Sequence, residues 1–67
     1  MKKLEHIGIA VKNLEESNAL FARLLGKPHY KVEVVESEGV RTSFFVVGGI
    51  KIELLEATQP DSTIWRL

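Results

Sequence analysis

Two side chains of this sequence, His6 and Glu53, have chemistry that becomes useful if a fold brings them together. The sequence contains no cysteine, so disulfides and thiolate metal sites are excluded. Histidine, aspartate and glutamate are the strong metal ligands that remain. An imidazole beside a carboxylate can bind a cation. Each residue also has a structural interpretation, as a hydrogen-bonding histidine and a solvated strand glutamate, and both interpretations stay open at this point.

His6 belongs to a segment, residues 4–11, in which seven of the eight residues are uncharged. Such a run predicts a strand buried on both sides, and its side chains alternate between two faces. One face carries Ile7, Ile9 and Val11. The opposite face carries Leu4, His6, Gly8 and Ala10.

A helix is predicted over residues 14–25. Asn13 can cap its first turn, Gly26 can end it, and Pro28 prevents it from resuming. His29 follows in a loop and is expected at the surface. The apolar stripe of this helix consists of Leu14, Phe21 and Leu25, widened by Leu20 and Leu24.

Three more strands are predicted after the helix. Residues 30–36 mix apolar and charged side chains, as expected for an edge strand, and a turn follows at 37–39. Residues 40–47 and 50–56 form a hairpin around Gly48-Gly49, because both central positions of a type I′ turn need positive φ. A two-residue loop fixes the register of that hairpin as Val47 opposite Ile50, Phe45 opposite Ile52, Phe44 opposite Glu53, and Thr42 opposite Leu55.

The predicted order is therefore β-α-β-β-β, an α+β module with sheet order 1-4-3-2 and the helix on one face. The connection that leaves the first strand passes through the helix and is expected to be a right-handed crossover. Together with the two hairpins that follow, it makes the first and last strands parallel neighbours. A ferredoxin-like arrangement, with the first strand beside the third, is the alternative. In the preferred topology His6 and Glu53 share the face away from the helix. The apolar residues Phe45, Val47, Ile50, Ile52 and Leu54 face the helix with Ile7, Ile9 and Val11.

Composition limits the classes of function. Hydrophobic residues are 45% and charged residues 27%, which is typical of a folded domain. Nine basic and nine acidic residues leave no net charge to attract nucleic acid or anionic lipid. No apolar run approaches the roughly 18–20 residues that span a bilayer. The first residues do not resemble a signal peptide, so we expect a cytoplasmic protein.

Length raises the question of a partner. A domain of 67 residues has a small core, and such domains often need a metal or an oligomer. Residues 1–67 are predicted to be a single module that ends inside a helix begun near 61–64, capped by Asp61 or Ser62, which suggests a truncated boundary. We expect a homodimer or a missing second module to cover the apolar residues of the sheet face away from the helix, which are Gly8, Ala10, Phe44, Val46 and Leu55.

Several stretches resemble a known superfamily. These are Leu4-Glu5-His6-Ile7-Gly8-Ile9-Ala10-Val11, Asn13-Leu14-Glu15-Glu16-Ser17, Leu24-Leu25-Gly26, Gly48-Gly49-Ile50-Lys51-Ile52-Glu53-Leu54-Leu55-Glu56 and Asp61-Ser62-Thr63-Ile64. They are similar to the vicinal-oxygen-chelate (glyoxalase/bleomycin-resistance) superfamily, and within it to the N-terminal module of the methylmalonyl-CoA epimerases. The resemblance covers essentially the whole chain.

The resemblance implies a site and a reaction. Superfamily enzymes build a metal site from two facing βαβββ modules, with ligands from the first and last strands, which here are His6 and Glu53. A divalent ion (Co²⁺, Mn²⁺, Zn²⁺ or Mg²⁺) suits these ligands. The implied activity is isomerisation of a CoA thioester at its α-carbon through a metal-stabilised enediolate. Positions matching the substrate side of the family are Thr42, Leu55, Ser62 and Thr63.

Other functions stay open. Glyoxalase I-like lyases and other superfamily enzymes share the histidine and the acid, and a non-catalytic dimerising or binding module is a further alternative. Thr42 stands where some relatives carry an acid, and the second module's catalytic glutamate is absent. The catalytic residue is thus unknown, and we expect the 67-residue form to be weakly active or inactive.

Overall fold

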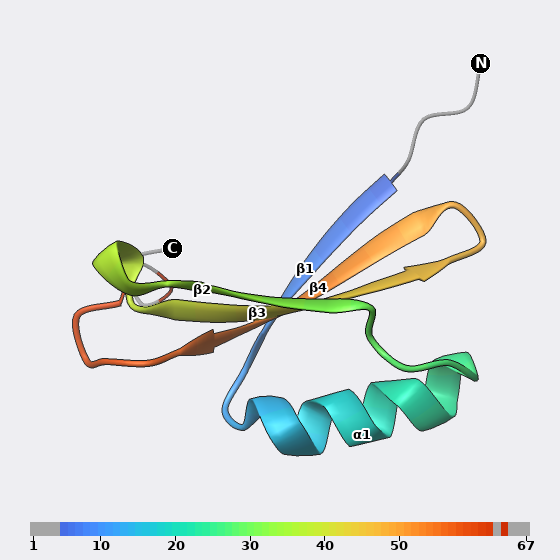
Figure 1. Cartoon of the computed structure of the whole chain (residues 1–67), viewed down its shortest axis with the longest axis horizontal. Helices are drawn as coiled ribbons and strands as arrows, with labels where there is room; N and C mark the ends of the chain where they lie inside the picture. Colours follow the sequence, from blue (N-terminus) through green and yellow to red (C-terminus); the bar gives the residue numbers. More distant parts are fainter. Residues whose placement is uncertain (1–4, 63, 65–67) are drawn as a thin grey trace.

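The computed structural model describes residues 5–62 and 64, which form one sheet and one long helix (Figure 1). The elements in chain order are β1 (Glu5–Val11), α1 (Leu14–Leu25), β2 (Lys31–Val35), a 3₁₀ helix η1 (Glu36–Glu38), β3 (Val40–Val47) and β4 (Ile50–Ala57). The order β-α-β-β-β is that predicted from the sequence. Strand boundaries differ from the prediction by one residue at each end of β2 and at the end of β4.

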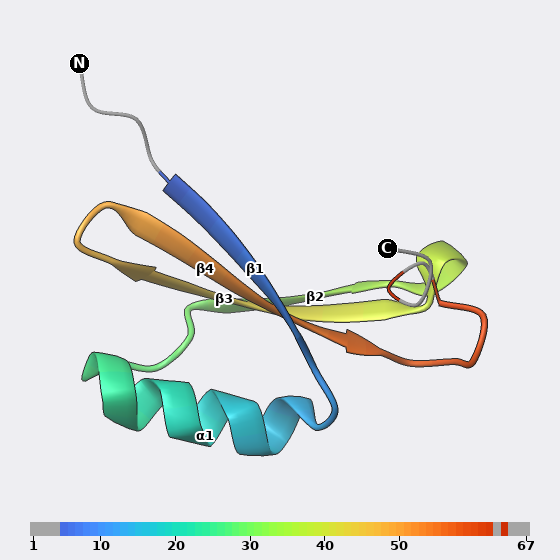
Figure 2. The same cartoon turned by 180° about the vertical axis from the view of Figure 1, so that it is seen from behind.

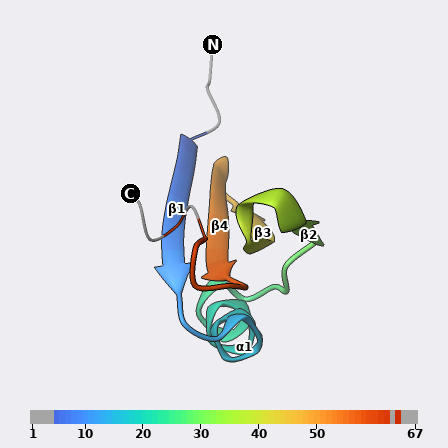
Figure 3. The same ribbon diagram turned by 90° about the vertical axis from the view of Figure 1, so that its left-hand side faces the viewer.

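The sheet has the predicted order β1-β4-β3-β2. β1 pairs with β4 in parallel, whereas β3 pairs antiparallel with both β4 and β2. The ferredoxin-like alternative is therefore wrong, since β1 lies beside β4 and not beside β3. Seen from the side, the strands lie next to one another in this order with α1 end-on at one face (Figure 3).

Local sequence signals account for both ends of α1. The side-chain oxygen of Asn13 accepts a hydrogen bond of 2.9 Å from the backbone N–H of Glu16, which satisfies one of the free donors of the first turn. Gly26 ends the helix in the left-handed region, with φ at 79°, and its N–H donates to the carbonyl of Ala22. Because this φ favours glycine, the helix stops where the sequence predicts.

The β3–β4 hairpin has the predicted two-residue turn and register. Gly48 and Gly49 have φ values of 56° and 81°, as a type I′ turn requires. Phe44 consequently lies opposite Glu53, and Thr42 opposite Leu55. This register sets which side chains share a face across the strands that carry the site.

The core lies between α1 and one face of the sheet. Leu14, Phe45 and Leu54 are at most 2% exposed. Partly buried residues packed around them are Ile9, Val11, Phe21, Ala22, Leu25 and Ile52. The prediction was wrong for the outer end of this face: Ile7 is 45% exposed and Ile50 37%. Sheet twist turns the start of β1 and the hairpin tip away from α1, so the helix does not cover them (Figure 2).

Three other expectations need correction. β1 was expected to be buried on both sides, but five of its seven residues are exposed, because β1 is an edge strand. Residues 37–39 were expected as a turn. The chain does turn there, but the turn begins one residue earlier, as the single 3₁₀ turn η1 (Glu36–Glu38) ended by Gly39 in the left-handed region. His29 was expected at the surface. It is half-buried, with its ring 5.9 Å from that of Phe45 between centroids.

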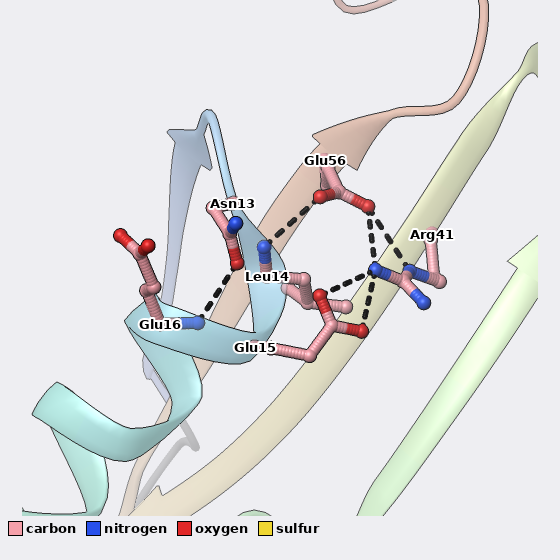
Figure 4. Close-up of polar contacts among 6 residues, drawn as sticks. All are labelled: Asn13, Leu14, Glu15, Glu16, Arg41 and Glu56. Carbon is pink, nitrogen blue, oxygen red and sulfur yellow. Dashed lines mark hydrogen bonds and ion pairs between the residues drawn. The ribbon is translucent and has the colours of Figure 1, made fainter.

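A charged network holds the start of α1 against the sheet (Figure 4). One carboxylate oxygen of Glu56 accepts a hydrogen bond of 3.0 Å from the backbone N–H of Leu14, and the other accepts one of 3.0 Å from Nε of Arg41. Nη2 of Arg41 also reaches Glu15, at 2.9 Å. Burial opposes the charge of Arg41, but its bonds and charge interactions with Glu56 and Glu15 outweigh that effect and raise its pKa.

The chain after β4 folds back toward the rest of the sheet. The N–H of Thr58 donates to the carbonyl of Gly39 at 2.8 Å, and Ser62 is fully buried. The helix predicted to begin near 61–64 falls mostly on Thr63 and residues 65–67, which lie outside the described residues. No helical segment within residues 5–62 and 64 has the length and apolar character needed to cross a membrane.

Candidate metal site

The fold brings His6 and Glu53 together on the sheet face away from α1, which we call the second face. Nδ1 of His6 lies 3.4 Å from Oε2 of Glu53, although 46 residues separate them in the sequence. In the β1–β4 register Gly8 is level with Glu53, and His6 is level with Lys51, so the two side chains approach diagonally across the strands. The imidazole is 57% exposed and the carboxylate 26%.

An open pocket of about 390 Å³ adjoins this pair. It is lined by Gly8, Ala10, Glu53, Leu55 and Ile64. Glu53 thus belongs both to the His6 pair and to the pocket wall. Small residues on β1 create the space, and Leu55 and Ile64 make most of its remaining surface apolar. A cation held by Glu53 would lie at the rim of a cavity suited to a small apolar group.

The predicted substrate-contacting residues are placed differently from one another. Leu55 lines the pocket. Thr42 is opposite Leu55 on the same face but only 7% exposed. Ser62 is fully buried, and its hydroxyl accepts the N–H of Ile64 at 3.2 Å. Thr63 lies outside the described residues. Leu55 is therefore the one among them whose contact with the pocket is visible in this structure.

One chain supplies two of the six ligands of an octahedral cation. Among residues 5–62 and 64, no group of three or more histidine and acidic side chains is close enough to hold a metal ion. The neighbouring acid on β4, Glu56, points to the α1 side and is already bonded to Leu14 and Arg41. Imidazole nitrogen and carboxylate oxygen fit a divalent cation chemically. They would hold it firmly only with further ligands from elsewhere.

The lysines of the second face are functional candidates that were not predicted from the sequence. Lys31 and Lys51 place their ammonium groups 4.9 and 5.1 Å from the centroid of the Phe44 ring. Phe44 was expected to be an exposed apolar residue here, but it is only 7% exposed because these lysines and Tyr30 surround it. Strand alternation did carry the signal for Lys51, since it lies two residues before Glu53 and therefore on its face.

A mixed sheet of order β1-β4-β3-β2, with one crossover helix and an imidazole–carboxylate pair on the uncovered face, defines a glyoxalase-like βαβββ module. Comparison with protein-family models agrees with this class. Residues 5–66 match the model described as Glyoxalase/Bleomycin resistance protein/Dioxygenase superfamily. The chain belongs to this superfamily.

Two curated relatives are similar in sequence. One is the uncharacterized protein YqjC of Bacillus subtilis (strain 168), 36% identical over 96% of this chain and 46% of its own length. The other is the mitochondrial methylmalonyl-CoA epimerase of Mus musculus, 32% identical over 92% of this chain and 35% of its own length. The chain thus spans half or less of the length of these relatives.

Solved structures show the same pattern. A hypothetical protein from Bacillus halodurans C-125 superposes with a TM-score of 0.83 at 36% identity, over 96% of this chain and 46% of that one. A second match is a variant of methylmalonyl-CoA epimerase from Streptomyces coelicolor in complex with 2-nitronate-propionyl-CoA. It superposes with a TM-score of 0.78 at 28% identity, over 97% of this chain and 51% of that one. One βαβββ module therefore corresponds to about half of each structure.

Proposed function

We propose that this chain supplies the N-terminal half of a metal-dependent methylmalonyl-CoA epimerase, which racemises the α-carbon of a CoA thioester. The observation that carries the proposal is the pairing of His6 with Glu53 beside an apolar pocket on the second face. Similarity to methylmalonyl-CoA epimerases from two organisms supports the choice of substrate class. A cytoplasmic location is part of the same proposal.

In this proposal His6 and Glu53 hold a divalent cation, Co²⁺, Mn²⁺, Zn²⁺ or Mg²⁺. The cation supplies Lewis acidity, which lowers the pKa of the proton beside a bound carbonyl. The chain's own residues bind and orient the substrate. Gly8, Ala10 and Leu55 receive its small apolar group next to the Glu53 carboxylate, which fixes which side of the α-carbon faces the protein.

The remaining ligands come from a second βαβββ unit facing the first, either a second copy of this chain or a second module. Two His6–Glu53 pairs would give four ligands and leave two positions of an octahedron for a bidentate substrate. Both carboxylates would then be committed to the cation. Thr42 cannot carry a proton in both directions at neutral pH, so a homodimer of the 67-residue chain would bind metal and epimerise weakly or not at all.

The test is calorimetric titration of the tag-free chain with Co²⁺, for wild type, His6→Ala and His29→Ala. We expect His6→Ala to lose at least about tenfold in affinity, because one of two ligands is removed. His29→Ala should match wild type, since His29 packs against Phe45 on the α1 side. Equal Co²⁺ binding by wild type and His6→Ala would show that His6 is not a metal ligand and would rule out the proposed site.

Two further measurements separate this proposal from its alternatives. Proton exchange at the α-carbon of methylmalonyl-CoA, followed by NMR in D₂O, should be slow with the 67-residue chain and fast only when a second module supplies a base. A protein that binds no metal but forms a stable dimer would indicate a non-catalytic dimerising module. Turnover of a hemithioacetal in place of the CoA thioester would indicate a glyoxalase I-like lyase.

A further inference from the structure

We propose that Lys31 and Lys51, held over the ring of Phe44, bind an anionic group of the substrate, a phosphate or a carboxylate. The inference rests on the proposed function, because it assigns a second binding subsite on the same face. It adds residues that belong neither to the His6–Glu53 pair nor to the pocket. Its basis is the geometry of the two lysines and their position relative to His6 and Glu53.

The two ammonium groups are gathered around one aromatic ring. Phe44 is on β3, Lys31 on β2 and Lys51 on β4, so the lysines approach the ring from the strands on either side of it. Their Nζ atoms lie 4.9 and 5.1 Å from the ring centroid, within the range of a cation–π contact. The attraction of each ammonium group to the Phe44 ring restricts both side chains, which lowers the entropy lost when a ligand binds.

Strand register places the two lysines and Phe44 beside the His6–Glu53 pair. Lys31 and Glu53 are both level with Phe44 on the strands that flank it. Lys51 is level with His6. The pocket of Gly8, Ala10 and Leu55 continues from Glu53 in the other direction along the strands. A ligand bound at His6–Glu53 therefore has the apolar cavity on one side along the strands and Lys51 on the other, with Lys31 level with Glu53 across β3.

The lysines have free capacity for an anion. Within residues 5–62 and 64, Lys51 forms no ion pair. Lys31 pairs with Glu33 at 3.0 Å, but both side chains are about half exposed, at 48% and 53%. Exposed pairs of this kind contribute little to stability, so an incoming anion can replace Glu33 at small cost. Each ammonium group has donors and no acceptor, which suits phosphate or carboxylate oxygen.

A CoA thioester of a dicarboxylic acid carries both kinds of anion, in its phosphates and in its acyl carboxylate. The test uses the tag-free chain at low salt and without metal, titrated with coenzyme A, which has phosphates and no carboxylate, and with methylmalonate, which has carboxylates and no phosphate. Variants are Lys31→Met, Lys51→Met and the double variant, because methionine keeps an unbranched stem over Phe44 without the charge. Lys27→Met, in the exposed turn after α1, is the matched control.

We expect wild type to bind at least one probe and the double variant to bind it at least about tenfold more weakly, as for the loss of charge-assisted hydrogen bonds. Lys27→Met should match wild type. If the lysine variants bind only coenzyme A more weakly, the lysines contact its phosphates. If they bind only methylmalonate more weakly, the lysines contact the carboxylate. Amide NMR spectra check that each variant is folded, and a single-lysine variant that stays folded suffices for the test if the double variant does not.

Three results would overturn the inference: no binding of either probe by wild type, unchanged binding by the folded lysine variants, or an equal loss in Lys27→Met. The last would mean that only overall charge matters. Co²⁺ titration of the same variants keeps the two proposals distinguishable. Failure of Co²⁺ binding in wild type would remove the metal site and leave the anion result readable, because the probes are titrated without metal.

Discussion

The two faces of the sheet differ in how their polar groups are used. On the α1 face, charged groups hold the helix and the sheet together. The carboxylate of Glu56 accepts hydrogen bonds from the side chain of Arg41 and from the backbone N–H of Leu14, and the apolar core lies beside them. On the second face, His6 and Glu53 contact each other at 3.4 Å beside an open pocket. Their remaining donor and acceptor capacity is directed outward.

This difference indicates where stability and function reside. Residues of the α1 face are bonded or packed within the chain, so replacing them should change the free energy of unfolding. Residues of the site on the second face are bonded little within the chain, so replacing them should change binding and leave stability nearly unaltered. Substitutions on the two faces should therefore separate stability from binding.

Phe45→Ala should have the largest effect on stability. Phe45 is fully buried, and its ring lies 6.2 Å from that of Phe21 on α1. Truncating a buried phenylalanine costs about 3–5 kcal/mol, which is most of the stability of a small domain. We expect the variant to be largely unfolded by circular dichroism at 25 °C. Val34→Ala, at a site 54% exposed, should unfold like wild type. A well-folded Phe45→Ala protein would show that the core lies elsewhere.

Glu56→Ala should have an intermediate effect. The change leaves the N–H of Leu14 without its acceptor and Arg41 with only Glu15, so we expect a loss of about 1–3 kcal/mol in urea unfolding. Glu36→Ala removes an exposed acid of η1 and is the control, expected within about 0.5 kcal/mol of wild type. Equal midpoints for the two variants would contradict the role of the network.

The pH dependence of the Arg41 contribution follows from its raised pKa. Because the folded-state pKa of Arg41 lies above the ordinary arginine value, its contribution is fully present at every pH below that ordinary value. It is lost only as the pH rises through the higher folded value. Urea midpoints of Arg41→Met and wild type should therefore differ by the same amount at pH 7 and pH 9. A difference that disappears between these values would show that another group titrates in the network.

Short-range signals in the sequence were sufficient for the fold. Asn13 and Gly26 set the ends of α1, and Gly48-Gly49 set the hairpin register. Once the register is known, strand alternation places His6 and Glu53 on one face. These features depend on backbone geometry and on residues close in sequence, which is why they could be predicted without coordinates.

Features that depend on side-chain reach across strands could not be predicted. The Arg41 bridge joins Glu15 and Glu56, which are 41 residues apart, and many acids were available as partners. His29 packs against Phe45 because of the path of an irregular loop. The lysines over Phe44 depend on side-chain rotamers that alternation does not specify. The roles predicted for Thr42 and Ser62 stay predictions.

The smallest effect on stability is expected at the site itself, for His6→Ala and Glu53→Ala. Their mutual contact involves an imidazole that is 57% exposed, and exposed pairs contribute about 0–1 kcal/mol. Urea midpoints should therefore stay close to wild type, while Co²⁺ binding is lost in both variants. Large destabilisation by either change would mean that the pair is structural. Preserved folding together with lost Co²⁺ binding would show that His6 and Glu53 serve a ligand and not the fold. Stability would then depend on residues of the core, and Co²⁺ binding on residues of the second face.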